Sequence, residues 1–196
     1  MTITLRRYAR QGLLLLAVAA SAATGHARQV EGQTLAEQQQ LGGTLLELNG
    51  VGVRAVAWLK GYVAGLYLTR KCRTAAEVVG APGPKRLQLR MLQNVAADEF
   101  AKAFDRGVRR HASDAELEQL RGRMADFEQI VRSVGRVRKG DVIDVDYLPT
   151  AGTTMAINGR IAGPAIAGRD FHAALLQVFV GEKVTDPGLR VGLLGG

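Results

Sequence analysis

The stretch that decides the fold is LLELNGVGVRAVAWL, residues 45–59, together with the run YVAGLYL at 62–68. The dipeptide Asn49-Gly50 is typical of two-residue hairpin turns, so we predict a strand before it and another over 51–59. The runs after the dipeptide are apolar at odd and even positions alike. A strand with one face in water alternates between apolar and polar residues, whereas a strand covered on both faces does not. We therefore predict that these strands lie in the middle of a sheet, with material packed on each side.

In the segments that follow, predicted strands and predicted helices occur in groups rather than in alternation. Further strands are expected at 86–92, 142–148, 153–157 and 160–166, the last after a second turn at Asn158-Gly159. Helices are expected at 74–79, 100–108, 113–134 and 171–179, with a short one at 186–194. The order of strands, helices, strands and helix predicts an α+β fold, with a large antiparallel sheet and a helical layer on one face.

Residues 1–27 have the pattern of a secretory signal peptide. Basic residues precede the apolar run GLLLLAVAA at 12–20, and small residues follow it up to Ala27. This run is shorter than the roughly 20 apolar residues that a membrane-spanning helix needs. We therefore predict cleavage after Ala27 and a periplasmic protein, and a retained membrane anchor is the alternative.

The chain beyond the leader is long enough for one domain, which we expect at 45–196 after a polar, partly disordered lead-in at 28–44. Removal of the leader's arginines lowers the net charge from +8 to +5 over 169 residues. The remaining basic residues are interleaved with acidic ones, a pattern of solvated surface rather than of a phosphate-binding stripe. We therefore predict no nucleic-acid partner.

One glycine motif, at 50–55, matches the G-x-G-x-x-A pattern of dinucleotide-binding loops. In those loops the glycines open a helix, and an acidic residue follows about 20 positions later. Here the glycines open a predicted strand, and the residues around position 72 are basic. We therefore interpret them as hairpin glycines and expect no cofactor.

Metal-binding and nucleophilic residues are few. Only His111 and His172 remain beyond the leader, and Cys72 is the single cysteine, so neither a zinc site nor a disulfide is expected. Acidic residues recur at 141–146, where solvated strand-edge residues are a better interpretation than a cation site. We expect no metal.

Arg54 is a charged residue within an apolar run, on a strand that is predicted to be covered on both faces. A guanidinium does not lose its charge, so its burial requires an anion or several carbonyl groups. An internal Asp or Glu is one such partner, and the carboxylate, phenolate or enolate of a ligand is the other. Tyr62 and Tyr67 have opposite parity on the next strand, so at most one of them joins Arg54.

These residues resemble the signature of the chalcone isomerase family. The matching runs are LNGVGVR at 48–54, GLYL at 65–68, SDAE at 113–116 and GEKV at 181–184. The likeness covers roughly 45–195 and is greatest to the exported bacterial chalcone-isomerase-like proteins. It implies an open-faced β-sandwich, in which a large antiparallel sheet carries a layer of helices.

The resemblance carries over only part of the family's catalytic set. In the plant enzymes an arginine holds the substrate, while a threonine and a tyrosine act through water on the developing enolate. The arginine position holds Arg54, and the threonine position holds Tyr62. The tyrosine position falls near Ala112, beside His111, and a later helix threonine falls near Val178. Of these four positions of the isomerase site, only that of Arg54 holds the expected residue type.

This pattern is similar to non-catalytic members of the family, some of which bind fatty acids through the arginine and a tyrosine. It implies a periplasmic protein in which Arg54 and Tyr62 hold a small amphipathic carboxylate or fatty-acid-like ligand. The alternative is an isomerase, an intramolecular lyase that uses Arg54 for an enolate and His111 or Tyr62 as acid or base. A role in protein interaction without a small ligand is the third interpretation.

Overall fold

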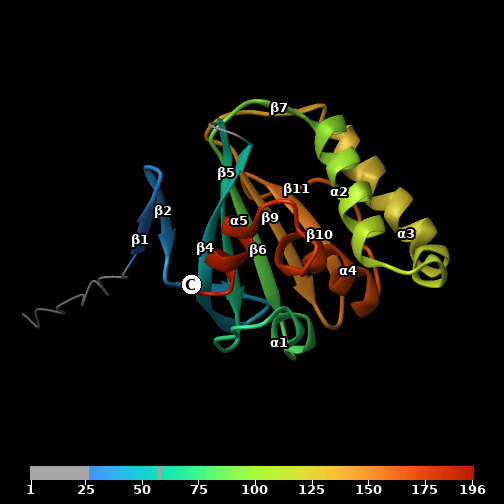
Figure 1. Ribbon diagram of the computed structural model, residues 1–196, viewed down its shortest axis with the longest axis horizontal. Helices are drawn as coiled ribbons and strands as arrows, with labels where there is room; N and C mark the ends of the chain where they lie inside the picture. The colour runs from blue at the N-terminus through green and yellow to red at the C-terminus, as the bar shows by residue number, and fades with distance from the viewer. Residues whose placement is uncertain (1–26, 57–58) are drawn as a thin grey trace, which may run out of the picture.

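A curved antiparallel sheet forms the centre of the computed structural model, which describes residues 27–56 and 59–196 (Figure 1). The leader predicted at 1–27 lies outside the described residues except for Ala27. Seven strands follow the order β11-β10-β9-β6-β5-β4-β3 across the sheet. They are β3 (Gln38–Leu41), β4 (Thr44–Val56), β5 (Leu59–Leu68), β6 (Lys85–Met91), β9 (Val142–Leu148), β10 (Gly152–Ile157) and β11 (Arg160–Ile161).

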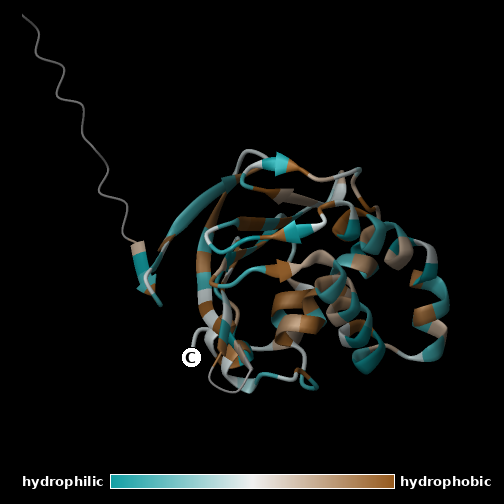
Figure 2. Cartoon of the chain, turned by 90° about the horizontal axis from the view of Figure 1, so that it is seen from above, coloured by the Kyte–Doolittle hydropathy of each residue, from teal (hydrophilic) through white to brown (hydrophobic). Residues whose placement is uncertain are grey.

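The longer helices gather on one side of this sheet (Figure 2). The helices of the described chain are α1 (Ala75–Gly80), α2 (Ala97–His111), α3 (Asp114–Ser133), α4 (Arg169–Val180) and α5 (Pro187–Leu193). Two short antiparallel pairs stand outside the main sheet, namely β1 (Ala27–Val30) with β2 (Gln33–Ala36), and β7 (Val95–Ala96) with β8 (Arg136–Val137). The arrangement confirms the predicted α+β class with a helical layer on an antiparallel sheet.

Both faces of β4 and β5 are covered, as their continuous apolar pattern predicts. Ala64 and Leu66 of β5 face the helices in the main core. On the other face, Val63 and Tyr67 form a smaller cluster with Leu35 of β2, and each of these side chains is fully buried. The lead-in at 28–44 differs from expectation, because it contains β2 and β3, and β3 pairs with β4 at the edge of the sheet.

The dipeptide Asn49-Gly50 is not a turn, and the prediction of one is wrong. β4 runs through it with a bulge between Leu48 and Gly50. The side chain of Asn49 is buried, and its Nδ2 donates to the carbonyls of Cys72 (3.0 Å) and Leu193 (2.8 Å). Its Oδ1 accepts from the N–H of Cys72 at 2.6 Å. These bonds to distant segments override the local turn preference of the dipeptide.

Gly50 and Gly52 are required because α5 lies directly on β4. A Cβ on Gly50 would come within 2.2 Å of the Gly192 carbonyl oxygen, and one on Gly52 within 2.3 Å of the Leu189 carbonyl oxygen. Conversely, a Cβ on Gly192 would come within 2.3 Å of the Val51 oxygen. The interpretation of Gly50 and Gly52 as hairpin glycines is therefore wrong. They mark the close approach of a second backbone, which is a recurrent reason for glycine inside a strand.

Local signals elsewhere in the chain are confirmed. Ser113 and Glu116 form a reciprocal capping box at the start of α3. Asn158 and Gly159 have φ values of 50° and 78° and join β10 to β11, as a two-residue turn of this composition requires. The strand predicted at 160–166 is shorter in the structure, where β11 ends at Ile161.

Candidate ligand-binding site

A cavity of about 290 Å³ lies between the sheet and the helical layer. Its walls come from five neighbouring strands, β4, β5, β6, β9 and β10, and from α2, α3, α4 and the segment that leads into α5. Most of the lining is apolar. Among the described residues, the polar side chains in the lining are Arg54, Tyr62, Glu99, Thr185 and Asp186.

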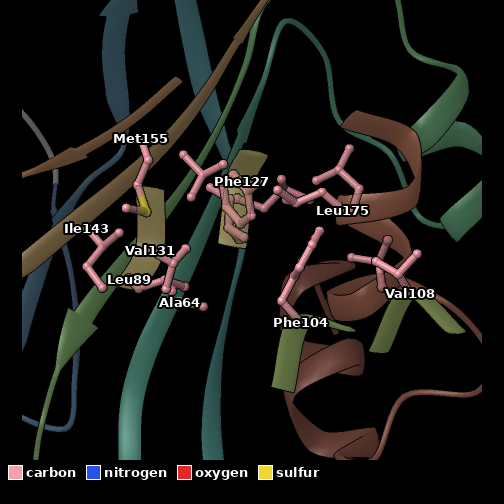
Figure 3. Close-up of a cluster of buried hydrophobic side chains, with 14 of the residues drawn as sticks. Ala64, Leu89, Phe104, Val108, Phe127, Val131, Ile143, Met155 and Leu175 are labelled. Carbon is pink, nitrogen blue, oxygen red and sulfur yellow. The ribbon is translucent and has the colours of Figure 1, made fainter. Parts of the chain in front are cut away.

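The apolar part of the cavity is a hydrocarbon surface with an aromatic centre. Leu89, Ile143 and Met155 project from three strands toward Phe127 of α3 and Phe104 of α2 (Figure 3). The ring centroids of Phe104 and Phe127 are 4.8 Å apart. Such a lining solvates an acyl chain or a flat ring, and it provides no partner for a charge.

Arg54 and Tyr62 lie opposite each other on β4 and β5. They are direct partners in the antiparallel ladder, so their side chains share the face of the sheet that lines the cavity. Tyr67 lies in the cluster on the opposite face, as its parity predicts. Of the three site residues expected from the sequence, Arg54, Tyr62 and His111, the structure therefore brings the first two together at the cavity.

Asp186 is the anion beside Arg54. The Arg54 Nη1 atom lies 3.4 Å from Asp186 Oδ2 and also donates to the Ala55 carbonyl at 3.3 Å. The two charged side chains are 28% and 15% exposed, so the pair is shielded from water but still reachable from the cavity. The structure thus shows an internal ion pair of the kind considered for Arg54, and it places that pair in the cavity wall.

Asp186 is held in place by the backbone as well as by Arg54. A register shift follows Arg54 in the β4–β5 ladder, and the N–H of Ala55 donates to Asp186 Oδ2 at 2.9 Å. Oδ1 caps α5 by accepting from the N–H of Leu189 at 3.0 Å. Burial raises the pKa of Asp186, but the bonds from Ala55, Leu189 and Arg54 outweigh it and hold the pKa below its ordinary value. Asp186 is therefore a fixed, ionised carboxylate.

Tyr62 presents a protonated hydroxyl. The side chain is half-buried, and its ring stacks on Phe100 with centroids 6.2 Å apart and an interplanar angle of 25°. Burial raises the pKa of Tyr62, the charge of Arg54 opposes this rise, and the charge of Asp186 adds to it. The hydroxyl can accordingly donate and accept hydrogen bonds, but it is a poor source of phenolate at neutral pH.

His111 lies away from the cavity. It occupies the last turn of α2, where its Nδ1 lies 3.0 Å from the Gly107 carbonyl and its Nε2 accepts from the N–H of Lys183 at 3.1 Å. These partners assign the proton to Nδ1, so both ring nitrogens are occupied by the backbone. In this arrangement the imidazole joins α2 to the turn after α4, and it does not meet Arg54 and Tyr62 at the cavity.

Two of the acidic residues at 141–146, Asp144 and Asp146, lie on the interior strand β9, pair with Arg86 and are only 14% and 13% exposed, so their interpretation as solvated strand-edge residues is wrong. Arg86 makes two bonds of 2.6 Å to Asp146, one from Nε and one from Nη2, and its Nε lies 3.7 Å from Asp144. Within residues 27–56 and 59–196, no group of three or more His, Cys, Asp or Glu side chains is arranged to hold a metal ion. No helix within these described residues has the length and apolar character needed to span a membrane.

A second polar cluster lies on the helix-covered face but outside the cavity lining. Lys85 is 2% exposed, donates to the Ala81 carbonyl at 2.7 Å and lies 5.2 Å from the centre of the Tyr147 ring. His172 of α4 stacks on that ring at 4.5 Å, and its Nδ1 lies 3.2 Å from Thr153 Oγ1. Burial lowers the pKa of Lys85 to about 8. Burial, together with the charge of Lys85, lowers the pKa of His172 to about 3.

Asp186 is the site residue that the sequence did not single out. A local signal exists, because Asp186-Pro187 combines a preferred N-cap with proline at the first helical position. That signal predicts the start of α5. It does not connect Asp186 with Arg54, which lies 132 positions earlier in the chain.

Comparisons with known proteins agree with this architecture. A family model described as chalcone isomerase-like matches residues 27–195, a range that includes the lead-in. Among solved structures, the crystal structure of an Arabidopsis thaliana fatty-acid binding protein is similar, with a TM-score of 0.61 and 15% sequence identity. The similarity covers 86% of this chain and 96% of that chain, and at this identity it concerns the fold. No curated protein matches the sequence.

Proposed function

This chain belongs to the chalcone isomerase-like family, and from that premise we propose that it is a periplasmic, non-catalytic binding protein for a small amphipathic, fatty-acid-like ligand. The observation that carries the proposal is the cavity, in which an apolar space of about 290 Å³ has Arg54 and Tyr62 in its wall. Small-molecule sites combine these two properties, a mostly apolar lining and a few polar groups that orient the ligand.

The shape of the cavity favours a chain-like apolar part. The lining extends from Arg54 on β4 to Met155 and Ile157 on β10, across five adjacent strands. At about 4.8 Å between neighbouring strands, this distance is about 19 Å. The Arabidopsis thaliana protein of similar fold is a fatty-acid binding protein, and that likeness supports a ligand of this form here.

The isomerase alternative has weaker geometric support. Arg54 is already paired with Asp186, and burial keeps the hydroxyl of Tyr62 protonated. His111 is bonded to the backbone through both ring nitrogens and does not line the cavity. An assay of chalcone cyclisation tests this alternative directly, since turnover that is lost in Arg54→Ala would favour an enzyme over a binding protein.

The binding function is tested by native mass spectrometry of molecules that co-purify with the exported protein. Arg54→Ala is compared with Arg90→Ala, a matched control in which an arginine of the neighbouring strand β6 is removed from outside the cavity lining. We expect wild type and Arg90→Ala to retain an amphipathic ligand, and Arg54→Ala to retain much less. A wild-type protein that neither carries nor takes up an amphiphile after delipidation would refute the proposal.

The proposed location rests on the leader pattern at 1–27. Cell fractionation followed by N-terminal sequencing checks it. We expect a periplasmic protein whose first residue is Arg28. A protein found in the membrane fraction with residues 1–27 still attached would instead indicate the retained anchor.

A further inference from the structure

The head-group end of the cavity already contains an anion. Asp186 lies in the lining with its Oδ2 3.4 Å from the guanidinium of Arg54, so the charge of the arginine is balanced before any ligand enters. Glu99, an exposed residue of α2, adds a second carboxylate to the same lining. Within the described lining, acidic side chains therefore outnumber basic ones.

Asp186 is not free to leave when a ligand arrives. Its two carboxylate oxygens accept the N–H groups of Ala55 and Leu189 at 2.9 and 3.0 Å, in addition to the contact with Arg54. Moving the side chain would leave a partly buried N–H unpaired and would remove the N-cap of α5. A ligand carboxylate placed on Arg54 would thus share the guanidinium with a fixed carboxylate, and like charges at this separation repel.

We propose that Asp186 sets the head-group selectivity of the cavity, which favours an amphiphile with an uncharged hydrogen-bonding head group over the ionised carboxylate of the matched fatty acid. The inference rests on the proposed binding function and specifies its ligand class. A hydroxyl head group suits this end of the cavity, because it can donate to Asp186 and accept from Tyr62 or Arg54 at the same time. Arg54 then acts through its pair with Asp186 rather than as an isolated cation.

The test compares dodecan-1-ol with dodecanoate at pH 8, where the acid is ionised, by calorimetric titration of the delipidated protein. The variant is Asp186→Asn, because asparagine is also a preferred N-cap and removes only the charge. Asp141→Asn is the matched control, since Asp141 accepts the N–H of Arg138 at 2.7 Å but lies outside the cavity lining. Thermal unfolding confirms that each variant is folded.

We expect wild type to bind dodecan-1-ol at least about 10-fold more tightly than dodecanoate. Asp186→Asn should raise the affinity for dodecanoate by about 10-fold or more and change that for the alcohol by less than about 3-fold. Asp141→Asn should leave the ratio unchanged. Wild type that prefers dodecanoate, or an Asp186→Asn variant with an unaltered ratio, would overturn the inference.

Two outcomes separate this inference from the function on which it rests. If none of the proteins binds either amphiphile, the proposed binding function fails. If Asp186→Asn does not fold, the wild-type protein still decides the matter with methyl dodecanoate as a second uncharged ligand. Tighter binding of the alcohol and the ester than of dodecanoate supports the selectivity, and tighter binding of dodecanoate refutes it.

Discussion

The helix-covered face of the sheet carries two polar clusters at opposite ends of β6, and they handle charge in different ways. Met91 at one end of β6 pairs with Tyr62, and Lys85 at the other end pairs with Tyr147. Met91 lies six residues along the strand from Lys85, which is a distance of about 20 Å. At the first end, Arg54 is balanced by Asp186 in the wall of a cavity. At the second, Lys85 is buried with no carboxylate among its partners in the described chain.

The difference teaches which of the two clusters can serve a ligand. A charge that has an opposite charge beside it keeps its ionic form in a shielded place, and it is available to orient a head group. A charge that is buried without such a partner is disfavoured, and the pKa values of Lys85 and His172 fall accordingly. The paired cluster, Arg54 with Asp186, is therefore suited to binding a ligand head group. The unpaired cluster, Lys85 with His172, instead makes the free energy of unfolding depend on pH.

The largest effect is expected at His172. In the folded protein this side chain stays neutral down to a pKa of about 3, whereas in the unfolded chain it takes up a proton near its ordinary value of 6.5. Unfolding therefore binds a proton between these values, and the free energy of unfolding falls as the pH drops, by about 5 kcal/mol over the whole window. Urea unfolding between pH 7 and pH 5 measures this slope. It should be reduced in His172→Gln, and parallel curves for the two proteins would contradict the account.

A smaller effect of the same sign is expected at Lys85. Its pKa is about 8 in the folded protein against 10.5 for the ordinary side chain, so the unfolded state binds more protons between these values. The free energy of unfolding should thus rise with pH from about 8 to 10.5, by about 3 kcal/mol at most. Denaturant titrations at pH 8 and pH 10 check the rise. Lys85→Met, which cannot titrate, should lack it.

At the paired cluster, Asp186→Ala should lower the free energy of unfolding by about 2 kcal/mol. The substitution removes the N-cap of α5 and leaves Arg54 without its anion. Asp170→Ala is the matched control, because Asp170 lies in the first turn of α4 and pairs with Arg123 but is 56% exposed. That loss should stay below about 1 kcal/mol. Thermal and urea unfolding measure both losses. If the two variants lose equal amounts of stability, the ion pair at the cavity is an ordinary surface pair.

The smallest effect on stability is expected for Tyr62→Phe. The stacking on Phe100 is kept, so the free energy of unfolding should change by less than about 0.5 kcal/mol. Affinity for dodecan-1-ol should nevertheless fall, by about 3- to 10-fold, because the hydroxyl no longer reaches the head group. Calorimetric titration measures this split. An unchanged affinity would remove Tyr62 from the head-group site.

The two Asn-Gly dipeptides show what could be predicted from the sequence. Asn158-Gly159 forms the expected turn, because its exposed residues take positive φ values and join two strands that pair directly with each other. Asn49-Gly50 does not, because the side chain of Asn49 bonds to residues 23 and 144 positions away. A dipeptide preference is a local property, and it holds only where no distant contact replaces it.

The same limit applies to the candidate site. Strand parity was sufficient to place Tyr62 and Tyr67 on opposite faces, since alternation along a strand is a local rule. That Tyr62 is the one beside Arg54 depends on the register between β4 and β5, which parity alone does not give. The partner of Arg54 could be predicted only as an internal acid, without its identity. Asp186 reaches it because Gly50 and Gly52 let α5 lie against β4, and this packing has no signature in a single segment.

The backbone-to-backbone packing of α5 on β4 also has a consequence for the order of folding. A chain synthesised only as far as α4 contains the strands of the sheet, the longer helices and most of the apolar lining, but Arg54 then has no Asp186 beside it. Contacts over such a long stretch of chain form late, because closing the loop costs entropy before the contact is gained. An apolar compartment with an unbalanced arginine would thus precede the finished site, and selection between a charged and an uncharged head group would begin only when α5 docks.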